Sequence, residues 1–294
     1  MLRTWFEIPL WQRVITALIL GVLTGWAWGP EAESIKWIGD FFIKAIKMLV
    51  VPLIFFSLVS GVAAIGDLHV TDQSEHKYRD LFVEISQKAD VLALCGDLTN
   101  FGKTREAEIL AEDLHACTIP TVAVLGNHDH ECGQPEEVAR ILHSAGVTVL
   151  DEQAVEIKGV GFAGVKGFVG GFGRGELGAF GETAIKGFVE ESINEARKLE
   201  NALRSLRTDR TVAVLHYSPI AKTVEGEPPE IFPFLGSSRL ADAIDRFDNV
   251  RFAVHGHAHR GTFEGKTPRG VAVYNCAQFV VSEQFGRPYA LIAV

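Results

Sequence analysis

The 294-residue sequence has few cysteines and no excess of positive charge. It contains four Cys, none in a Cys-x-x-Cys pair, which excludes a disulfide-rich miniature protein and is typical of a reducing compartment. With 28 Lys and Arg against 37 Asp and Glu, it lacks the basic stripe of a protein that grips long nucleic acid. Its 47% hydrophobic content excludes a chain that is disordered throughout.

Two residue types are each absent from one part of the chain. No Trp occurs after Trp37, and no His occurs before His69. Residues 1–66 carry five basic and four acidic side chains, whereas residues 67–294 carry 23 basic and 33 acidic ones, a net charge of −10. A single uniform domain would not separate residues in this way. The length also suits two domains, so we expect two unlike parts.

The first part contains two stretches without charged side chains, residues 14–30 and 48–66. About 20 apolar residues span the hydrocarbon core of a bilayer, and Trp rings near the ends of such runs favour its interfaces. These features predict a membrane-inserted helical hairpin over residues ~14–60. The alternatives are a cleaved signal peptide, which lacks a small-residue cleavage pattern here, and two buried helices of a soluble fold.

This part resembles the start of the dicarboxylate/amino acid:cation symporters. The resemblance implies two transmembrane helices that follow a cytoplasmic N-terminus. The ion and substrate sites of that family lie in later segments that are absent here, so transport by this chain alone is not expected. The matching stretches are Leu10-Trp11-Gln12-Arg13, Gly39-Asp40-Phe41-Phe42-Ile43 and residues 46–61, IKMLVVPLIFFSLVSG.

Short apolar runs followed by polar clusters recur after residue 61. Runs of this length, rich in β-branched residues, predict buried strands. Stretches with helical spacing lie between them, within residues 78–85, 107–114 and 138–142. The alternation indicates an α/β fold with layered sheets. The predicted strands are residues 62–65, 91–95, 122–125, 212–215 and 252–254.

Each predicted strand is followed within two residues by Asp, Asn or His. The carboxyl ends of such strands converge on one ligand site. Oxygen and imidazole ligands without thiolates suit Mn²⁺, Fe or Zn²⁺. Seven ligands are too many for one ion but suffice for two ions that share a carboxylate, an arrangement that can activate water against a phosphoryl group. The seven are Asp67, His69, Asp97, Asn127, His216, His257 and His259.

These residues resemble the motifs of the calcineurin-like metallophosphoesterases, in family order: Asp67-x-His69, Gly96-Asp97, Gly126-Asn127-His128-Asp129, His216 and Gly256-His257-x-His259. The resemblance implies a layered α/β sandwich with mixed sheets and a site for two divalent metal ions. One ion would bind Asp67, His69, Asp97 and His259, with Asp97 as the bridge, and the other would bind Asn127, His216 and His257. His128 would stabilise charge on the phosphate or protonate the leaving group, and Asp129 would orient His128.

A glycine-rich stretch, residues 161–181, contains Lys166 and Arg174 as its only cations. Two interpretations are equally open. It is a loop over the metals in which Arg174 contacts the substrate phosphate, or it is a turn-rich connection whose Phe side chains cover the sheet. No phosphate-loop motif is present to favour the first.

Residues 62–65 satisfy both resemblances, yet they cannot be a membrane helix and a sheet strand at once. We place the boundary so that residues 1–61 form the hydrophobic hairpin and residues 62–294 form the phosphoesterase domain. The predicted function is hydrolysis of a small phosphomonoester or phosphodiester by an enzyme domain held at the cytoplasmic face of a membrane, or free in the cytoplasm without the N-terminal segment. The alternative is a non-catalytic, membrane-anchored or transporter-associated module with a vestigial metal site.

Overall fold

The computed structural model describes residues 61–294 continuously, together with residues 21–22, 26–27, 29, 37, 40–41 and 43–44. The chain divides into two compact units, Met1–Ser57 and Leu58–Val294. The predicted hairpin over residues 14–60 lies almost entirely outside the described residues. Within the part that is described, no helix is long and apolar enough to cross a membrane.

Two mixed sheets form the centre of the second unit. The first has the strand order β11-β1-β2-β3-β4, in which β11 alone runs antiparallel to its neighbour. Its strands are β11 (Ala290–Ile292), β1 (Val62–Ile65), β2 (Val91–Cys95), β3 (Thr121–Val124) and β4 (Val147–Val149).

The second sheet has the order β5-β6-β7-β8-β10-β9, with four parallel strands between two antiparallel edge strands. These strands are β5 (Gln153–Ile157), β6 (Val160–Val165), β7 (Thr211–Leu215), β8 (Val250–His255), β10 (Ala272–Asn275) and β9 (Glu264–Lys266). The predicted α/β class with mixed sheets is therefore confirmed.

The alternation of side chains along each strand produces four layers. In β1, Val62 and Ala64 face the second sheet, whereas Ala63 and Ile65 face the helices that cover the first sheet. The second sheet divides in the same way: Val212 and Val214 of β7 join the core between the sheets, and Ala213 and Leu215 pack against helices. Because both faces of the sheets are covered at their centre, central strands such as β1 and β2 are apolar throughout.

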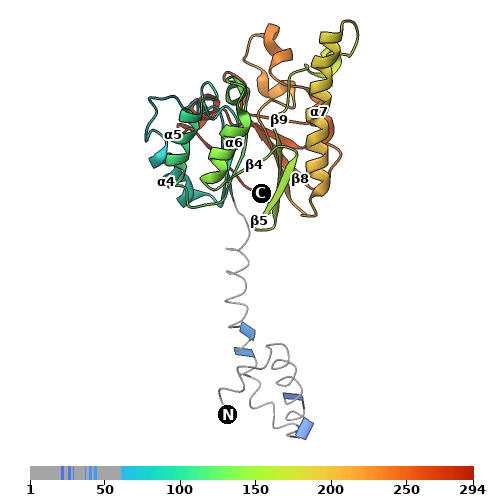
Figure 1. The fold of residues 1–294 in the computed structure, drawn as a ribbon. Helices are drawn as coiled ribbons and strands as arrows, with labels where there is room; N and C mark the ends of the chain where they lie inside the picture. The colour runs from blue at the N-terminus through green and yellow to red at the C-terminus, as the bar shows by residue number, and fades with distance from the viewer. Residues whose placement is uncertain are drawn as a thin grey trace. The chain divides into compact units, whose positions relative to one another are not determined.

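Helices cover the outer faces of both sheets. In Figure 1, α4, α5 and α6 lie on one side of the domain and α7 lies on the other. The predicted helical stretches become α4, α5 and α6, whereas the 23-residue α7 corresponds to no predicted helix. The helices are α4 (Arg79–Lys88), α5 (Thr104–Leu114), α6 (Pro135–Ser144), α7 (Thr183–Ser205), α8 (Ser238–Ile244) and α9 (Gln278–Phe285).

Residues 62–65 are a strand. They form β1, which pairs with β2 on one side and with β11 on the other, and all four side chains are buried. The two partners use the hydrogen-bonding groups of both edges of β1. These residues therefore belong to the sheet rather than to a helix that continues the preceding apolar run.

The glycine-rich stretch 161–181 is tied to its surroundings through its backbone and its aromatic rings. Gly170 N donates to Pro233 O and Gly171 N donates to Gly236 O, each at 2.9 Å. The Phe168 ring lies 5.2 Å from that of Phe188. These contacts are with α7 and with residues 233–236, whereas the Phe180 side chain is 91% exposed, and residues 161–165 of the stretch belong to strand β6.

Candidate metal centre

The polar residues that follow the strands meet at one end of the two sheets. Asp67 and His69 follow β1, Asp97 follows β2 and Asn127 follows β3, all in the first sheet. His216 follows β7, and His257 and His259 follow β8, in the second sheet. Parallel strands direct their carboxyl ends to the same edge, and the packing of the sheets brings the two sets together.

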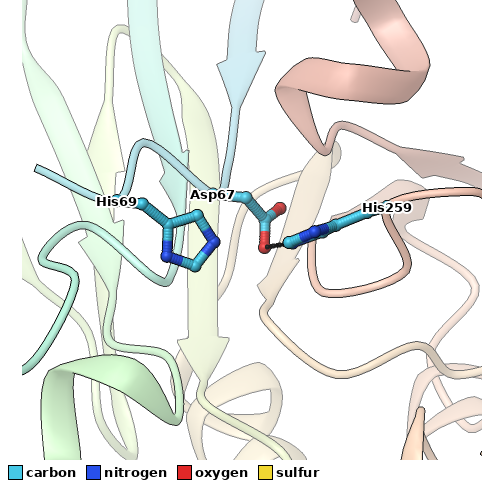
Figure 2. Close-up of side chains that lie close together, drawn as sticks. All are labelled: Asp67, His69 and His259. Carbon is cyan, nitrogen blue, oxygen red and sulfur yellow. Dashed lines mark hydrogen bonds and ion pairs between the residues drawn. The ribbon is translucent and has the colours of Figure 1, made fainter.

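One group of potential metal ligands consists of Asp67, His69 and His259, whose ligand atoms lie within 4.8 Å of one another. Figure 2 shows the two imidazole rings on either side of the Asp67 carboxylate. His259 Nε2 lies 3.0 Å from Asp67 Oδ1, and the backbone N–H of His257 also donates to the carboxylate. Asp67 is fully buried, so its charge requires such partners.

Asp97 lies between this group and a second one. It shares one possible metal site with His69 and His128 and another with His216 and His257. Its Oδ2 is 4.0 Å from His69 Nε2, and its Oδ1 is 3.3 Å from His216 Nε2. A carboxylate with one oxygen directed to each group has the placement that a bridging ligand requires.

Asn127 joins the second group through His216. The Asn127 Oδ1 atom lies 3.0 Å from His216 Nε2, and the rings of His216 and His257 lie 4.9 Å apart. The structure therefore brings together all seven residues that the sequence assigns to metals. It also brings in His128, whose Nε2 is 4.0 Å from Asp97 Oδ2.

Unpaired lone pairs in this cluster fit a bound cation. Both ring nitrogens of His69 are buried without a hydrogen-bond partner. His216 Nδ1 lies 2.9 Å from Cys95 O, and a carbonyl only accepts, so Nδ1 carries the proton. In the neutral ring, Nε2 then has a lone pair that faces the oxygens of Asn127 and Asp97. Divalent ions between these atoms would satisfy them, so the residues fit the metals that their chemistry predicts.

Electrostatics favour the neutral form of two imidazoles in the cluster, those of His69 and His257. Burial lowers the pKa of His69 to about 4 and that of His257 to about 3. Burial also raises the pKa of Asp97, even though the positive charge of His216 opposes this. For Asp67, the hydrogen bond from His259 and the charges of nearby His residues outweigh burial, and its pKa falls. Neutral His and ionised Asp67 are the forms that bind metals.

Backbone strain is concentrated at the same residues. Seven non-glycine residues in the described part of the chain have positive φ, and four of them are Asp67 (61°), His69 (46°), Asp97 (49°) and His257 (69°). A non-glycine residue in this region costs of order 1–3 kcal/mol, and such residues cluster at functional sites.

Two motif glycines leave room for the carboxylates. A Cβ on Gly126 would lie 2.1 Å from Asp97 Oδ1, and one on Gly256 would lie 2.6 Å from Asp67 Oδ2. Any side chain at these positions would displace the carboxylates. Glycine is therefore required at both positions for steric reasons.

The contacts of Asp129 differ from the prediction that it orients His128. Its buried carboxylate accepts hydrogen bonds from Leu98 N, Thr99 N, Thr99 Oγ1 and Gly126 N. His128 Nδ1 instead lies 2.7 Å from the carbonyl of Asn100. Because its oxygens bind the loops that follow β2 and β3, Asp129 fixes the backbone around His128 rather than its ring.

Several groups that position the ligands were not predicted. Phe234 O lies 3.2 Å from His257 Nε2, and the Gln278 side chain donates to Asp67 O. Main-chain carbonyls leave no trace in a sequence, and Gln278 reaches the site only through the fold. His255 is buried with its ring nitrogens beside Gly256 O and Thr223 Oγ1.

Arg174 lies in the short 3₁₀ helix η3 (Gly173–Gly175), and its side chain is exposed. Its contact with a substrate phosphate is still a prediction.

Comparisons with known proteins distinguish the two parts of the chain. The family model "Sodium:dicarboxylate symporter family" matches residues 10–86. The C4-dicarboxylate transport protein of Bacillus subtilis is 46% identical over 56 residues, which are 19% of this chain and 13% of the transporter. C4-dicarboxylate transport protein 3 of Bradyrhizobium diazoefficiens is 37% identical over 94 residues, 31% of this chain and 21% of the transporter. The chain thus spans less than a quarter of these relatives.

The second part resembles solved structures and matches a different family model. The phosphopantetheinyl hydrolase of Mycobacterium tuberculosis shares the fold with a TM-score of 0.57 and 14% identity, over 80% of this chain and 96% of that one. The model "Calcineurin-like phosphoesterase" matches residues 61–261. Since these residues are more than half of the sequence, the chain belongs to the calcineurin-like phosphoesterase family.

Proposed function

We propose that the protein hydrolyses a phosphomonoester or phosphodiester at a site for two divalent metal ions. The observation that carries this proposal is the convergence of seven oxygen and imidazole ligands, with Asp97 among the other six and both nitrogens of His69 buried and unpaired. A structural ion would need only one such group. Two groups that share a carboxylate suit the chemistry of phosphoryl transfer to water.

The ligand groups divide between the two ions. Asp67, His69, Asp97 and His259 would bind one ion, and Asp97, Asn127, His216 and His257 would bind the other. Bound divalent ions would supply Lewis acidity that activates water near neutral pH and neutralises charge on the phosphoryl oxygens. The donor set suits Mn²⁺, Fe or Zn²⁺.

His128 is suited to move a proton at Nε2. The Asn100 carbonyl beside Nδ1 can only accept, so Nδ1 keeps its proton in both charge states of the ring. The proton that His128 gains and loses is therefore the one on Nε2. This nitrogen lies 4.0 Å from Asp97 Oδ2, on the side of the ring that faces the ligands. There it can stabilise charge on the phosphate or protonate the leaving group.

The substrate is proposed to be small. Residues 67–294 carry a net charge of −10, which opposes binding of long nucleic acid. Arg174 is the candidate for a direct contact with the substrate phosphate.

Residues 1–61 are proposed to attach the phosphoesterase domain, residues 62–294, to a membrane. The support is the length of the two uncharged stretches and the match to the symporter family over residues 10–86. By analogy with that family, the phosphoesterase domain would face the cytoplasm. A chain without this segment would be cytoplasmic.

The test uses the purified full-length chain with added Mn²⁺ and both an aryl phosphate monoester and a diester. We expect hydrolysis that stops when metal is chelated, and a loss of at least a hundredfold in Asp97→Asn and His128→Ala variants. Hydrolysis that is unchanged in both variants would refute the assignment. Metal binding without turnover of any phosphoester would favour the alternative of a non-catalytic, membrane-anchored module.

A further inference from the structure

Three exposed phenylalanines lie in segments that contact the metal centre. Phe101, Phe234 and Phe279 have 47%, 57% and 49% of their surface exposed. They come from three separate segments: the loop before α5, the end of the 3₁₀ helix η5 (Pro229–Phe234), and the first turn of α9. Single exposed apolar side chains are common on protein surfaces, so their placement relative to the site is what requires an explanation.

Phe279 contacts a side chain of the site through its ring, whereas the segments of Phe234 and Phe101 contact the site through backbone carbonyls. The Phe279 ring lies 4.7 Å from the His259 ring, at an interplanar angle of 38°. Phe234 supplies the carbonyl beside His257 Nε2. Phe101 follows Asn100, whose carbonyl pairs with His128 Nδ1. The Phe279 ring therefore lies beside an imidazole of the centre, and the backbone next to the other two rings contacts two further imidazoles.

The backbone at each position is fixed by hydrogen bonds. Phe101 N donates to Glu106 Oε2 at 2.7 Å. The segment that ends in Phe234 is bound on both sides, by Gly170 N to Pro233 O at 2.9 Å and by Ser218 N to Leu235 O at 3.0 Å. The Gln278 side chain, next to Phe279, donates to Asp67 O. Rings on such anchored backbone offer a preorganised surface, which lowers the entropy cost of binding.

We infer that these three residues, which we call the phenylalanine rim, bind an aromatic group esterified to the phosphate of the substrate. The inference rests on the proposed function and adds the chemical class of the substrate. A polar metal centre by itself selects only the phosphoryl group. Flat, exposed rings on segments that contact the imidazoles would add contact with an aromatic ring that projects from the phosphoryl group, because aromatic pairs contribute beyond the area that they bury.

The test keeps the leaving group constant and varies the other ester group. Three diesters with a p-nitrophenyl leaving group, and methyl, octyl or phenyl as the second group, have the same chromophore. For the wild-type, full-length protein with Mn²⁺, we expect kcat/KM to be highest for the phenyl ester. Each ring contact should contribute roughly 2- to 12-fold, from the usual energy of an aromatic pair.

The rim variants and their control use the same helix. Phe279 and Phe285 both lie in α9 and have similar exposure, 49% and 45%, but the Phe285 ring packs on Phe263, away from the ligands. We expect Phe279→Ala and Phe279→Leu to lower the ratio of phenyl to methyl hydrolysis, whereas Phe285→Ala leaves this ratio as in the wild type. Phe279→Leu retains an apolar side chain, so a lower phenyl-to-methyl ratio in this variant identifies the aromatic ring as the cause.

The outcomes separate this inference from the proposed function. Equal kcat/KM for the phenyl and methyl esters would refute binding of an aromatic group by the phenylalanine rim, and would not affect the proposed hydrolase function. A larger gain with octyl than with phenyl would also refute such binding, in favour of a lipid substrate. If no ester is hydrolysed, the proposed function fails. Calorimetric titration of the Mn²⁺-loaded protein with phenyl phosphate and with methyl phosphate then tests binding by the phenylalanine rim separately from turnover. Equal affinity for the two would refute it.

Discussion

Replacement of Asp129 by Ala tests how the site is held in place. The buried carboxylate accepts hydrogen bonds from three backbone N–H groups, those of Leu98 (3.2 Å), Thr99 (2.7 Å) and Gly126 (2.7 Å), and from Thr99 Oγ1 (2.6 Å). These donors belong to the loops after β2 and β3, which carry Asp97 and Asn127. The variant removes every one of these acceptors.

The magnitude follows from the number of donors that lose their partner. A buried donor without a partner costs about 1–3 kcal/mol, so three backbone donors give an upper range of about 3–9 kcal/mol. Water that enters the space of the carboxylate would satisfy some of them. We therefore expect a loss of about 3–5 kcal/mol in the free energy of unfolding, or roughly 10 °C in Tm for a domain of this size.

Far-ultraviolet circular dichroism during urea and thermal unfolding is the suitable assay. Tryptophan fluorescence would report on the wrong part of the chain, because every Trp lies at or before Trp37. Asp129→Asn, which retains one oxygen acceptor, should fall between Asp129→Ala and the wild type. The matched control is Asp248→Ala, since the Asp248 side chain is 90% exposed and its loss should change stability by less than about 0.5 kcal/mol. A change below about 1 kcal/mol for Asp129→Ala would refute this account of its role.

Three further predictions concern the metals and the substrate. Gly126→Ala should weaken Mn²⁺ binding at least tenfold in calorimetry, since its Cβ would lie 2.1 Å from Asp97 Oδ1, while Gly178→Ala, with open space around it, should not. The pKa of His259 has two opposing influences: burial acts to lower it, and the hydrogen bond to Asp67 acts to raise it. The net effect is a raised pKa. Because bound His must be neutral, Mn²⁺ affinity should rise with pH through that raised pKa, and an affinity independent of pH would contradict this. Arg174→Ala should raise KM for a phosphomonoester if the side chain contacts phosphate, and unchanged kinetics would leave only the turn-rich connection.

Much of the sheet could be predicted because its central strands are buried on both faces. The predicted strands at residues 62–65 and 91–95 coincide with β1 and β2, and the prediction for residues 122–125 is one residue from β3. Continuous apolar runs of this kind have a clear signature. The boundary between the two resemblances was ambiguous in sequence because an apolar run suits a membrane helix and a buried strand equally.

Other elements have weaker signals for identifiable reasons. Strand β6 contains Gly161 and Gly164, and a Cβ on Gly164 would lie 2.8 Å from Val124 Cγ1 in the other sheet. The glycine that allows the sheets to approach also breaks the apolar run that would reveal the strand. Edge strands such as β9, with three residues, are too short to show a period.

The candidate site likewise contains some groups that the sequence reveals and others that it does not. Side chains with metal-binding chemistry, such as Asp97 and His216, are visible in the sequence because each follows an apolar run. Carbonyls such as those of Asn100 and Phe234 position His128 and His257 without any side-chain signature. The role of Asp129 was misassigned because adjacency to His128 in sequence does not determine which donors its carboxylate reaches.

The metal content of the purified protein tests the central claim most directly. Mass spectrometry of the metals in the full-length chain after loading with Mn²⁺ should give two ions per chain. An Asp97→Ala variant should lose both, because Asp97 lies near His69 on one side and His216 on the other and is the proposed bridge between the ions. The same loaded wild-type sample should hydrolyse a phosphoester. A wild-type chain that binds no Mn²⁺, Fe or Zn²⁺, or that binds two ions in the Asp97→Ala variant as well, would contradict the account.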